Sequence, residues 1–563
     1  MYSTEAENEE KFATADDSKR KVGILSMPSI LEGSGLLNPL ILLLFTLMAH
    51  GIILLNDGLY WDGWMIDSWQ RHNQWSTMKR FFSEVGMPFQ YYLHKIIAFS
   101  PNRSVVYRLL VLTSTYASPL AIYLTAVHFG FLDEKQALIL SLLYLSYTGY
   151  HMNVDTIIVL QYTLPVAMFY WAVYITFLSL NYTGVAHWGL HLTSLFLFWL
   201  AFSANSLLVY YFGFLGLKIF LKLNSLDDVW FNAGVELLKN LDYVIFPFLF
   251  WILKERLTPR HGSYKDYNRI RLHPMRVVRS FFNAVCSGFE APISDPIRSA
   301  AKAHFLWIAA SAFVLAFYVA TYSSFYFPAI SQPVTRTLLI AGVLFFGFAA
   351  LPYILIGQNF APGGWATKHH VLFHLPVSLM ILGISSLLFP TNVMFAAVVF
   401  ILVVNMIHLN SVYLYYIAVV AKDRSWLYKL SKIDSANRNS FFYISDNHSI
   451  QGDHYYLQDS PAYSFYMFDW LWGDKTRIGI QVPASYARRL EGEQIRRVIN
   501  DTTLGYDMQE VNVYGSQARL LISDGVKGAP VWVALMYLKE RYLPGGKVEK
   551  VLEGVTELKY EKI

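Results

Sequence analysis

The stretch that decides the fold is residues 36–67, LLNPLILLLFTLMAHGIILLNDGLYWDGWMID. Its first part, 36–55, holds no acidic or basic side chain other than a histidine, and it has the length of an apolar helix that crosses a bilayer. Its second part sets three carboxylates, Asp57, Asp62 and Asp67, among aromatic rings. We therefore expect a membrane helix that is followed by an acidic, aromatic segment at the membrane surface.

The composition of the whole chain agrees with this expectation. Of its 563 residues, 55% are hydrophobic and only 15% are charged, whereas soluble domains are about 25% charged. About a quarter of residues 422–563 are charged, against about a tenth of residues 1–421. The sequence thus predicts an α-helical polytopic membrane protein with a C-terminal mixed α/β soluble domain. The net charge of +5 gives no sign of a nucleic-acid partner, and the single cysteine, Cys286, excludes an internal disulfide.

Apolar stretches of spanning length recur after the first one. Nine stretches are long enough to span: 36–55, 105–130, 155–180, 186–203, 204–223, 304–328, 336–356, 371–389 and 393–420. With two shorter, ambiguous stretches, 136–150 and 241–253, they predict about eleven transmembrane helices. We expect a cytoplasmic polar tail over 1–35, a transmembrane module over 36–421 and the soluble domain over 422–563. In that domain we expect strands at 440–445, 477–482 and 518–523 and a helix at 484–499.

The charges before the first helix set the orientation. Lys19, Arg20 and Lys21 place the N-terminus in the cytoplasm by the positive-inside rule. With eleven spans, the outer face then carries a first outer loop, a basic loop, a late outer loop and the soluble domain; the three loops are 56–103, 254–303 and 357–370. If 241–253 does not span, everything after it inverts, and the ten Lys and Arg of the basic loop would fit that alternative. Within the first outer loop, 77–98 resembles two interfacial helices broken at Gly86-Met87-Pro88.

The first candidate site is the acidic segment itself. Asp62 stands between Trp61 and Gly63-Trp64, where aromatic rings would desolvate a carboxylate that acts as general base toward an acceptor hydroxyl. Asp57 is a further candidate catalytic acid, and the rings of Tyr60, Trp61 and Trp64 could pack on sugar faces. The alternative is a solvated loop with an interfacial aromatic belt.

The second candidate lies at Tyr150-His151-Met152-Asn153-Val154-Asp155. Asp155 precedes an apolar run, so it is either an ordinary helix N-cap or a second acid on the same membrane face as Asp62. Two acids that converge there could bind a divalent metal ion, Mg²⁺ or Mn²⁺, or an acceptor. His151 is a candidate acceptor contact.

The third candidate is the late outer loop, in which a Gly- and Pro-rich stretch leads into Lys368, His369 and His370 before an apolar helix. Cations at a helix start suit a phosphate, although Lys368 could also reach the lipid surface as an interfacial lysine. Arg269 and Arg271 of the basic loop would bind a donor phosphate if the loop lies outside, or anionic membrane lipids if it is cytoplasmic.

This arrangement resembles the GT-C superfamily of integral-membrane glycosyltransferases. Tyr60-Trp61-Asp62-Gly63-Trp64 looks like the acidic motif of that superfamily's first loop, Asp155 is similar in position to its second-loop acid, and Lys368 stands where an arginine is often found. The resemblance implies Asp62 as the catalytic carboxylate, a polyprenyl-phosphate sugar donor, a glycan, lipid or protein acceptor, and inversion at the anomeric carbon.

The leading hypothesis is therefore a glycosyltransferase of the cell inner or plasma membrane, active outside the cytoplasm in cell-envelope polysaccharide biosynthesis. A transporter or flippase of a lipid-linked or anionic solute is the main alternative, followed by a polymerase or ligase of lipid-linked chains and by a scaffold. The transferase hypothesis requires Asp62, Asp155 and Lys368 to converge around one cavity. Walker A, HExxH and GxSxG motifs are missing from the sequence.

Overall fold

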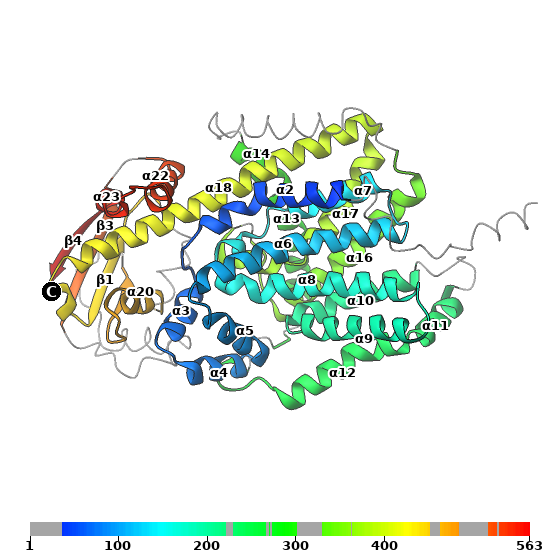
Figure 1. The fold of residues 1–563 in the computed structure, drawn as a ribbon, viewed down its shortest axis with the longest axis horizontal. Helices are drawn as coiled ribbons and strands as arrows, with labels where there is room; N and C mark the ends of the chain where they lie inside the picture. The colour runs from blue at the N-terminus through cyan, green and yellow to red at the C-terminus, as the bar shows by residue number, and fades with distance from the viewer. Residues whose placement is uncertain are drawn as a thin grey trace, which may run out of the picture.

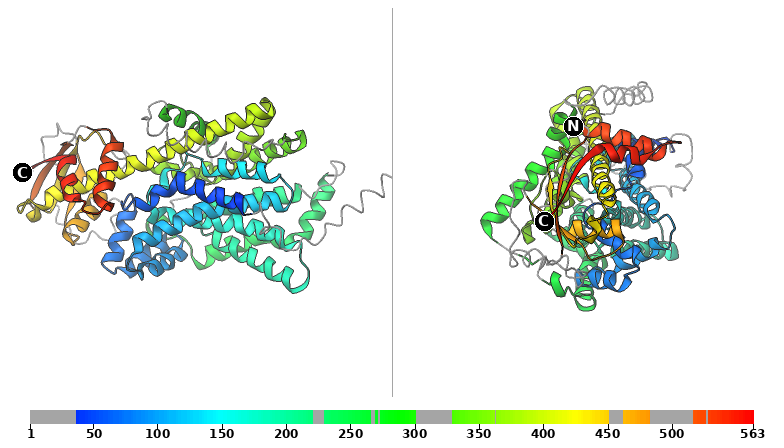
Figure 2. Two further views of the ribbon diagram at one scale, coloured as in Figure 1. Left: turned by 45° about the horizontal axis from the view of Figure 1, so that its top comes forward. Right: turned by 90° about the vertical axis from the view of Figure 1, so that its left-hand side faces the viewer.

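The computed structural model is predominantly helical, with a bundle of long helices and a small C-terminal domain built on a sheet (Figures 1 and 2). It describes residues 36–220, 229–265, 269–270, 273–300, 329–361, 363–450, 462–482, 516–525 and 528–563. The expected tail 1–35, the expected span 304–328 and the expected helix 484–499 lie outside these residues.

Six helices of the described residues are long and apolar enough to cross a membrane. They are α2 with the 3-10 helix η2 (Leu37–Leu55), α6 (Arg103–His128), α8 (Thr156–Ser179), α9 (Gly184–Ala201), α16 (Gln332–Ile356) and α18 (Thr391–Ser431). Shorter helices complete the bundle: α7 (Glu134–Leu145), α10 (Asn205–Phe220), α11 (Val229–Lys239), α12 (Leu241–Leu257), α13 (Pro274–Phe289), α14 (Asp295–Ala300) and α17 (His374–Leu388). The bundle is thus compatible with the predicted membrane protein, whereas a count of eleven spans is not confirmed. The ambiguous stretch 136–150 overlaps α7, a buried helix of 12 residues that is not among these six.

Contacts between loops show which connections share an end of this bundle. The Asn56 side chain donates to Val154 O at 3.2 Å, and the backbone N–H of His151 donates to Thr367 Oγ1 at 3.2 Å. The backbone N–H of His261 donates to Glu84 O at 3.3 Å. The first outer loop, the start of the basic loop and the late outer loop therefore meet at one end of the bundle.

The first outer loop folds into three short helices, α3 (Gly63–Arg71), α4 (Trp75–Glu84) and α5 (Pro88–Ala98). The predicted break between two helices is confirmed, because Gly86 has a φ of +75° and Pro88 begins α5. The separate helix α3, which begins directly after Asp62, was not predicted.

The C-terminal domain holds a four-stranded sheet in the order β2-β1-β3-β4. The strands β1 (Phe441–Asp446), β2 (Ile478–Gln481) and β3 (Gln517–Asp524) confirm the three predicted strands, and β1 runs parallel to both of its neighbours. The fourth strand, β4 (Thr556–Lys562), pairs antiparallel with β3. It was not predicted because TELKYEK is an edge strand rich in charged side chains.

The long helix α18 joins the two parts of the molecule (Figure 1). It leaves the bundle and continues into the C-terminal domain, where α22 (Pro530–Tyr542) and α23 (Val548–Val555) pack against it. Lys422 of α18 forms an ion pair with Asp446 of β1 at 2.7 Å. The expected domain boundary at residue 422 therefore falls inside a continuous helix rather than in a linker.

Candidate functional site

A tight turn presents Asp62 at the start of α3. Trp61 adopts a φ of +42°, which is uncommon for a residue with a side chain, and the Gly63 N–H donates to Tyr60 O at 2.7 Å. Asp62 occupies the N-cap position of α3, but its side chain makes no capping hydrogen bond. Its half-buried carboxylate is thus not used to close the helix end.

Asp155 lies at the start of α8, where its two carboxyl oxygens have different surroundings. Its Oδ1 accepts from the backbone N–H groups of Ile157 and Ile158 at 3.1 and 3.2 Å, so that it is the N-cap of α8. Its Oδ2 lies against Gly63, where a Cβ would come within 2.5 Å of it. The two interpretations that the sequence left open therefore both apply: Asp155 caps a helix and also lies beside Asp62.

The third predicted group, the Lys368 ammonium, lies near Asp62. Lys368 lies on the 3-10 helix η6 (Gly364–His370), which packs against η3 (His151–Val154). Its ammonium lies within electrostatic reach of Asp62, and each of the two groups favours the charged form of the other. The structure thus brings both Asp155 and Lys368 within electrostatic reach of Asp62.

Burial and neighbouring charges shift the pKa values of Asp62, Asp155 and Lys368. Burial raises the pKa of Asp62, while the Lys368 charge opposes that rise. Burial raises the pKa of Asp155 well above its ordinary value; its backbone hydrogen bonds oppose the rise, and the Asp62 charge adds to it. Burial lowers the pKa of Lys368 to about 8, against the attraction of Asp62. Burial thus favours the protonated form of both acids, whereas the attraction between Asp62 and Lys368 favours the charged form of that pair alone.

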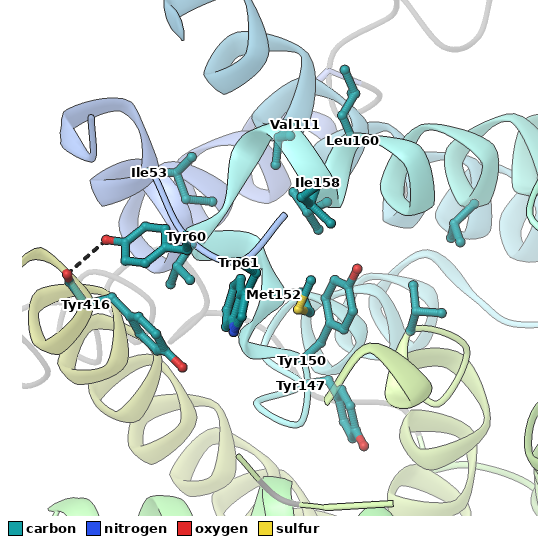
Figure 3. Close-up of a cluster of buried hydrophobic side chains, with 14 of the residues drawn as sticks. Ile53, Tyr60, Trp61, Val111, Tyr147, Tyr150, Met152, Ile158, Leu160 and Tyr416 are labelled. Carbon is teal, nitrogen blue, oxygen red and sulfur yellow. Dashed lines mark hydrogen bonds between the residues drawn. The ribbon is translucent and has the colours of Figure 1, made fainter. Parts of the chain in front are cut away.

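The aromatic rings around Asp62 are packing residues. Trp61 is 2% exposed, and its ring packs against the rings of Tyr60 and Tyr416, with centroid distances of 5.8 Å to both (Figure 3). The Tyr60 hydroxyl donates to Tyr416 O at 2.9 Å, and Trp64 is buried edge-on against Trp470 of the C-terminal domain. The predicted sugar platform of Tyr60, Trp61 and Trp64 is therefore not supported, because the three rings are buried by protein.

Of the three predicted histidines, His369 and His370 are buried and His151 is half-buried. Burial lowers the pKa of His151, His369 and His370 to about 3 in each case. His369 Nδ1 is 2.8 Å from Asn359 O, and His370 Nε2 is 3.0 Å from Ser287 Oγ. The prediction that His369 and His370 act as phosphate-binding cations is thus not supported. His151 Nε2 has no hydrogen-bond partner among the described residues, which leaves His151 as a candidate polar contact for a ligand.

Asp57 is occupied elsewhere. Its Oδ2 is 2.8 Å from Arg424 Nη1 and 3.2 Å from Arg541 Nη2, and its Oδ1 accepts from the Tyr537 hydroxyl at 3.3 Å. Both oxygens therefore bind the C-terminal domain, so a catalytic role for Asp57 is not supported. Of the predicted arginines, Arg269 is exposed after η4 (Gly262–Tyr264), and Arg271 lies outside the described residues.

A divalent cation fits the site poorly. The donor set offers two carboxylates, of which Asp155 already accepts two backbone N–H groups and Asp62 faces an ammonium. Within the described ranges, no group of three or more His, Cys, Asp or Glu side chains could hold a metal ion. Mg²⁺ and Mn²⁺ prefer several oxygen ligands in octahedral geometry, so we derive no step through a metal.

Sequence reasoning missed Tyr463, which the C-terminal domain brings to the acids. It lies in the first turn of α20 (Ala462–Trp472), and α20 packs against α3. Burial, and then the charges of Asp62 and Asp155, raise the pKa of Tyr463 well above the ordinary range. A neutral phenol therefore stands within electrostatic reach of both carboxylates. No local pattern could have indicated it, because it is some 400 residues from Asp62 in the chain.

Comparisons with protein-family models, curated proteins and solved structures find no match for this chain. The functional argument therefore rests on the site. That site combines the carboxyl groups of Asp62 and Asp155 with the amine of Lys368 at one end of an apolar helical bundle. Such a set can remove a proton from a hydroxyl group and stabilise an anionic leaving group nearby.

Proposed function

We propose that the protein is a membrane glycosyltransferase of the GT-C type that moves a sugar from a polyprenyl-phosphate donor to a hydroxyl of a glycan, lipid or protein acceptor. The observation that carries the proposal is the convergence of Asp62, Asp155 and Lys368 from three separate loops. A lipid-linked donor suits a site at the end of an apolar bundle, because its chain can remain in the membrane.

In the proposed reaction, the Asp62 carboxylate accepts the proton of the acceptor hydroxyl. The acceptor oxygen forms a bond to the anomeric carbon while the bond from that carbon to the phosphate oxygen breaks, with inversion. The departing electron pair stays on the phosphate, whose growing charge Lys368 stabilises. Asp155 keeps its proton and donates a hydrogen bond, since two ionised acids side by side would repel each other.

The proposal places this end of the bundle outside the cytoplasm, in the inner or plasma membrane, and includes the eleven-helix topology. Two features support a common face for the loops. The first outer loop, the start of the basic loop and the late outer loop contact one another, and the C-terminal domain binds the same loops. The positive-inside rule, applied to Lys19, Arg20 and Lys21, supports an outside location for this face.

The test is turnover of the purified protein with a panel of polyprenyl-phosphate sugars, with envelope extract as the source of acceptors. We expect release of free polyprenyl phosphate with at least one donor, and we expect Lys368→Ala to raise the donor KM. A folded protein that releases no lipid phosphate from any donor would overturn the proposal. Movement of the intact donor across the bilayer of a vesicle would then favour the transporter hypothesis.

A further inference from the structure

The segment that carries the proposed base is attached to the C-terminal domain at its beginning. Five residues before Asp62, the Asp57 carboxylate binds Arg424 of α18 and Arg541 of α22, and the Arg424 side chain also donates to Asp57 O at 2.9 Å. Tyr537 of α22 donates to the same carboxylate at 3.3 Å. This end of the segment therefore has a fixed position relative to the C-terminal domain.

The same segment is attached to the C-terminal domain again at its end. Asp469 of α20 is fully buried; its Oδ1 is 2.7 Å from His72 Nε2 and its Oδ2 is 3.4 Å from Arg71 Nη2. A buried carboxylate is costly unless it is paired, so these two contacts are needed for α20 to pack on α3. In the first turn of α3, the Trp64 ring packs edge-on against the Trp470 ring, with the ring centroids 6.2 Å apart. Figure 1 shows α20 beside α3.

Asp62 lies between these two attachments, on a turn that lacks a capping bond of its own. The left-handed backbone of Trp61 costs free energy, and it persists only where the surroundings hold it. On the side of the bundle, the Asp155 carboxylate lies directly against Gly63 of this turn. The C-terminal domain holds the segment before and after it.

We propose that the C-terminal domain is a positioning domain, which holds residues 57–72 at both ends through Asp57 and Asp469 and thereby orients the Asp62 carboxylate. Asp469 is then a positioning residue that acts through Arg71 and His72. The role of Asp62 as a general base rests on the proposed function. The attachment of residues 57–72 to the C-terminal domain does not depend on it. This positioning gives the soluble domain a role beyond bringing Tyr463 close to the two acids.

The proposal predicts a specific effect of Asp469→Asn in the full-length protein. The substitution keeps the shape but removes the charge that Arg71 and His72 share. Since a displacement of about 1 Å at a reacting group can cost about 100-fold in rate, we expect kcat to fall at least about tenfold while the donor KM stays within about threefold. We also expect the amide hydrogens of 57–72 to exchange faster with deuterated water.

Two further variants make the result specific. Glu553→Gln removes an exposed ion pair with Lys432 on the same domain and should change neither measurement. His72→Gln removes one partner from the α3 side, so it reproduces the effect even if Asp469→Asn weakens the domain itself. Faster exchange across 57–72 with a reduced kcat supports the proposal. Unchanged exchange in Asp469→Asn and His72→Gln overturns it, whether or not any donor is turned over. If the wild-type protein uses no donor but the amide hydrogens of 57–72 exchange faster in the two variants, the attachment is supported and the proposed transferase function fails.

Discussion

The carboxylate of Asp155 lies directly against Gly63, where a Cβ would stand 2.5 Å from Oδ2 and 2.8 Å from Oδ1. Gly63 directly follows Asp62, so the missing side chain lets two acids from separate loops approach each other. The Asp62 charge adds to the rise in the pKa of Asp155, whereas the Lys368 charge opposes the rise in the pKa of Asp62.

Gly63→Ala should therefore reduce activity strongly with a modest effect on stability. The new methyl group must displace the Asp155 carboxylate or the α3 turn, and we expect a loss of about 100-fold in kcat/KM. The free energy of unfolding should fall by about 1–3 kcal/mol. Gly51→Ala is the matched control, because a Cβ there meets nothing within 4 Å. Wild-type kinetics in Gly63→Ala would show that the approach of the two acids has no functional value.

The pH dependence of kcat/KM should be bell-shaped. Activity needs ionised Asp62, so it is lost as the pH falls through a pKa that is raised above the ordinary aspartate value. It also needs protonated Lys368, so it is lost as the pH rises through about 8. Lys368→Arg should move the high-pH limb upward, because a guanidinium keeps its charge. A limb that stays in place in this variant would rule out Lys368 as its origin.

Asp57→Asn separates attachment from catalysis. Removing the charge that Arg424 and Arg541 share should lower the free energy of unfolding by about 1–3 kcal/mol. We expect kcat to fall about tenfold through misplacement of the segment, well short of the loss in Asp62→Asn. Thermal unfolding and turnover in the same detergent would measure both. A loss of activity equal to that of Asp62→Asn would return Asp57 to the candidate catalytic residues.

A cysteine at position 265 tests the sidedness. Lys265 is exposed beside η4, and the neighbouring His261 bonds Glu84 of the first outer loop. In a background with Cys286→Ser, Lys265→Cys should react with a membrane-impermeant reagent applied to intact cells. Reaction only after permeabilisation would place the site in the cytoplasm, where a different donor would be required.

Much of the fold was predictable because it follows from local patterns. Apolar runs of spanning length gave α2, α6, α8 and α16, and short apolar runs gave three strands. The stretch 136–150 stayed ambiguous because its helix, α7, is buried in the bundle and has only 12 residues. The continuity of α18 through the charged residues 422–431 was missed because a rise in charge resembles a domain boundary.

The site was predictable where chemistry and topology agreed. Asp62, Asp155 and Lys368 each stand at the end of an apolar stretch, so a shared face brings them together. The partners of Asp57 and Asp469 were not predictable, because they depend on how a distant domain packs. The aromatic rings were misjudged for a related reason: a Trp-rich loop has the same composition whether its rings face a sugar or a protein core.

The most direct test of the central claim compares Asp62→Asn with Asp133→Asn in the release of polyprenyl phosphate. Asp133 caps α7 through the backbone N–H groups of Lys135 and Gln136, and asparagine is an equally good cap. We predict that Asp62→Asn folds but loses release by about 1,000-fold or more, as expected for loss of a general base, while Asp133→Asn keeps wild-type release. Equal release from wild type and a folded Asp62→Asn variant would contradict the account.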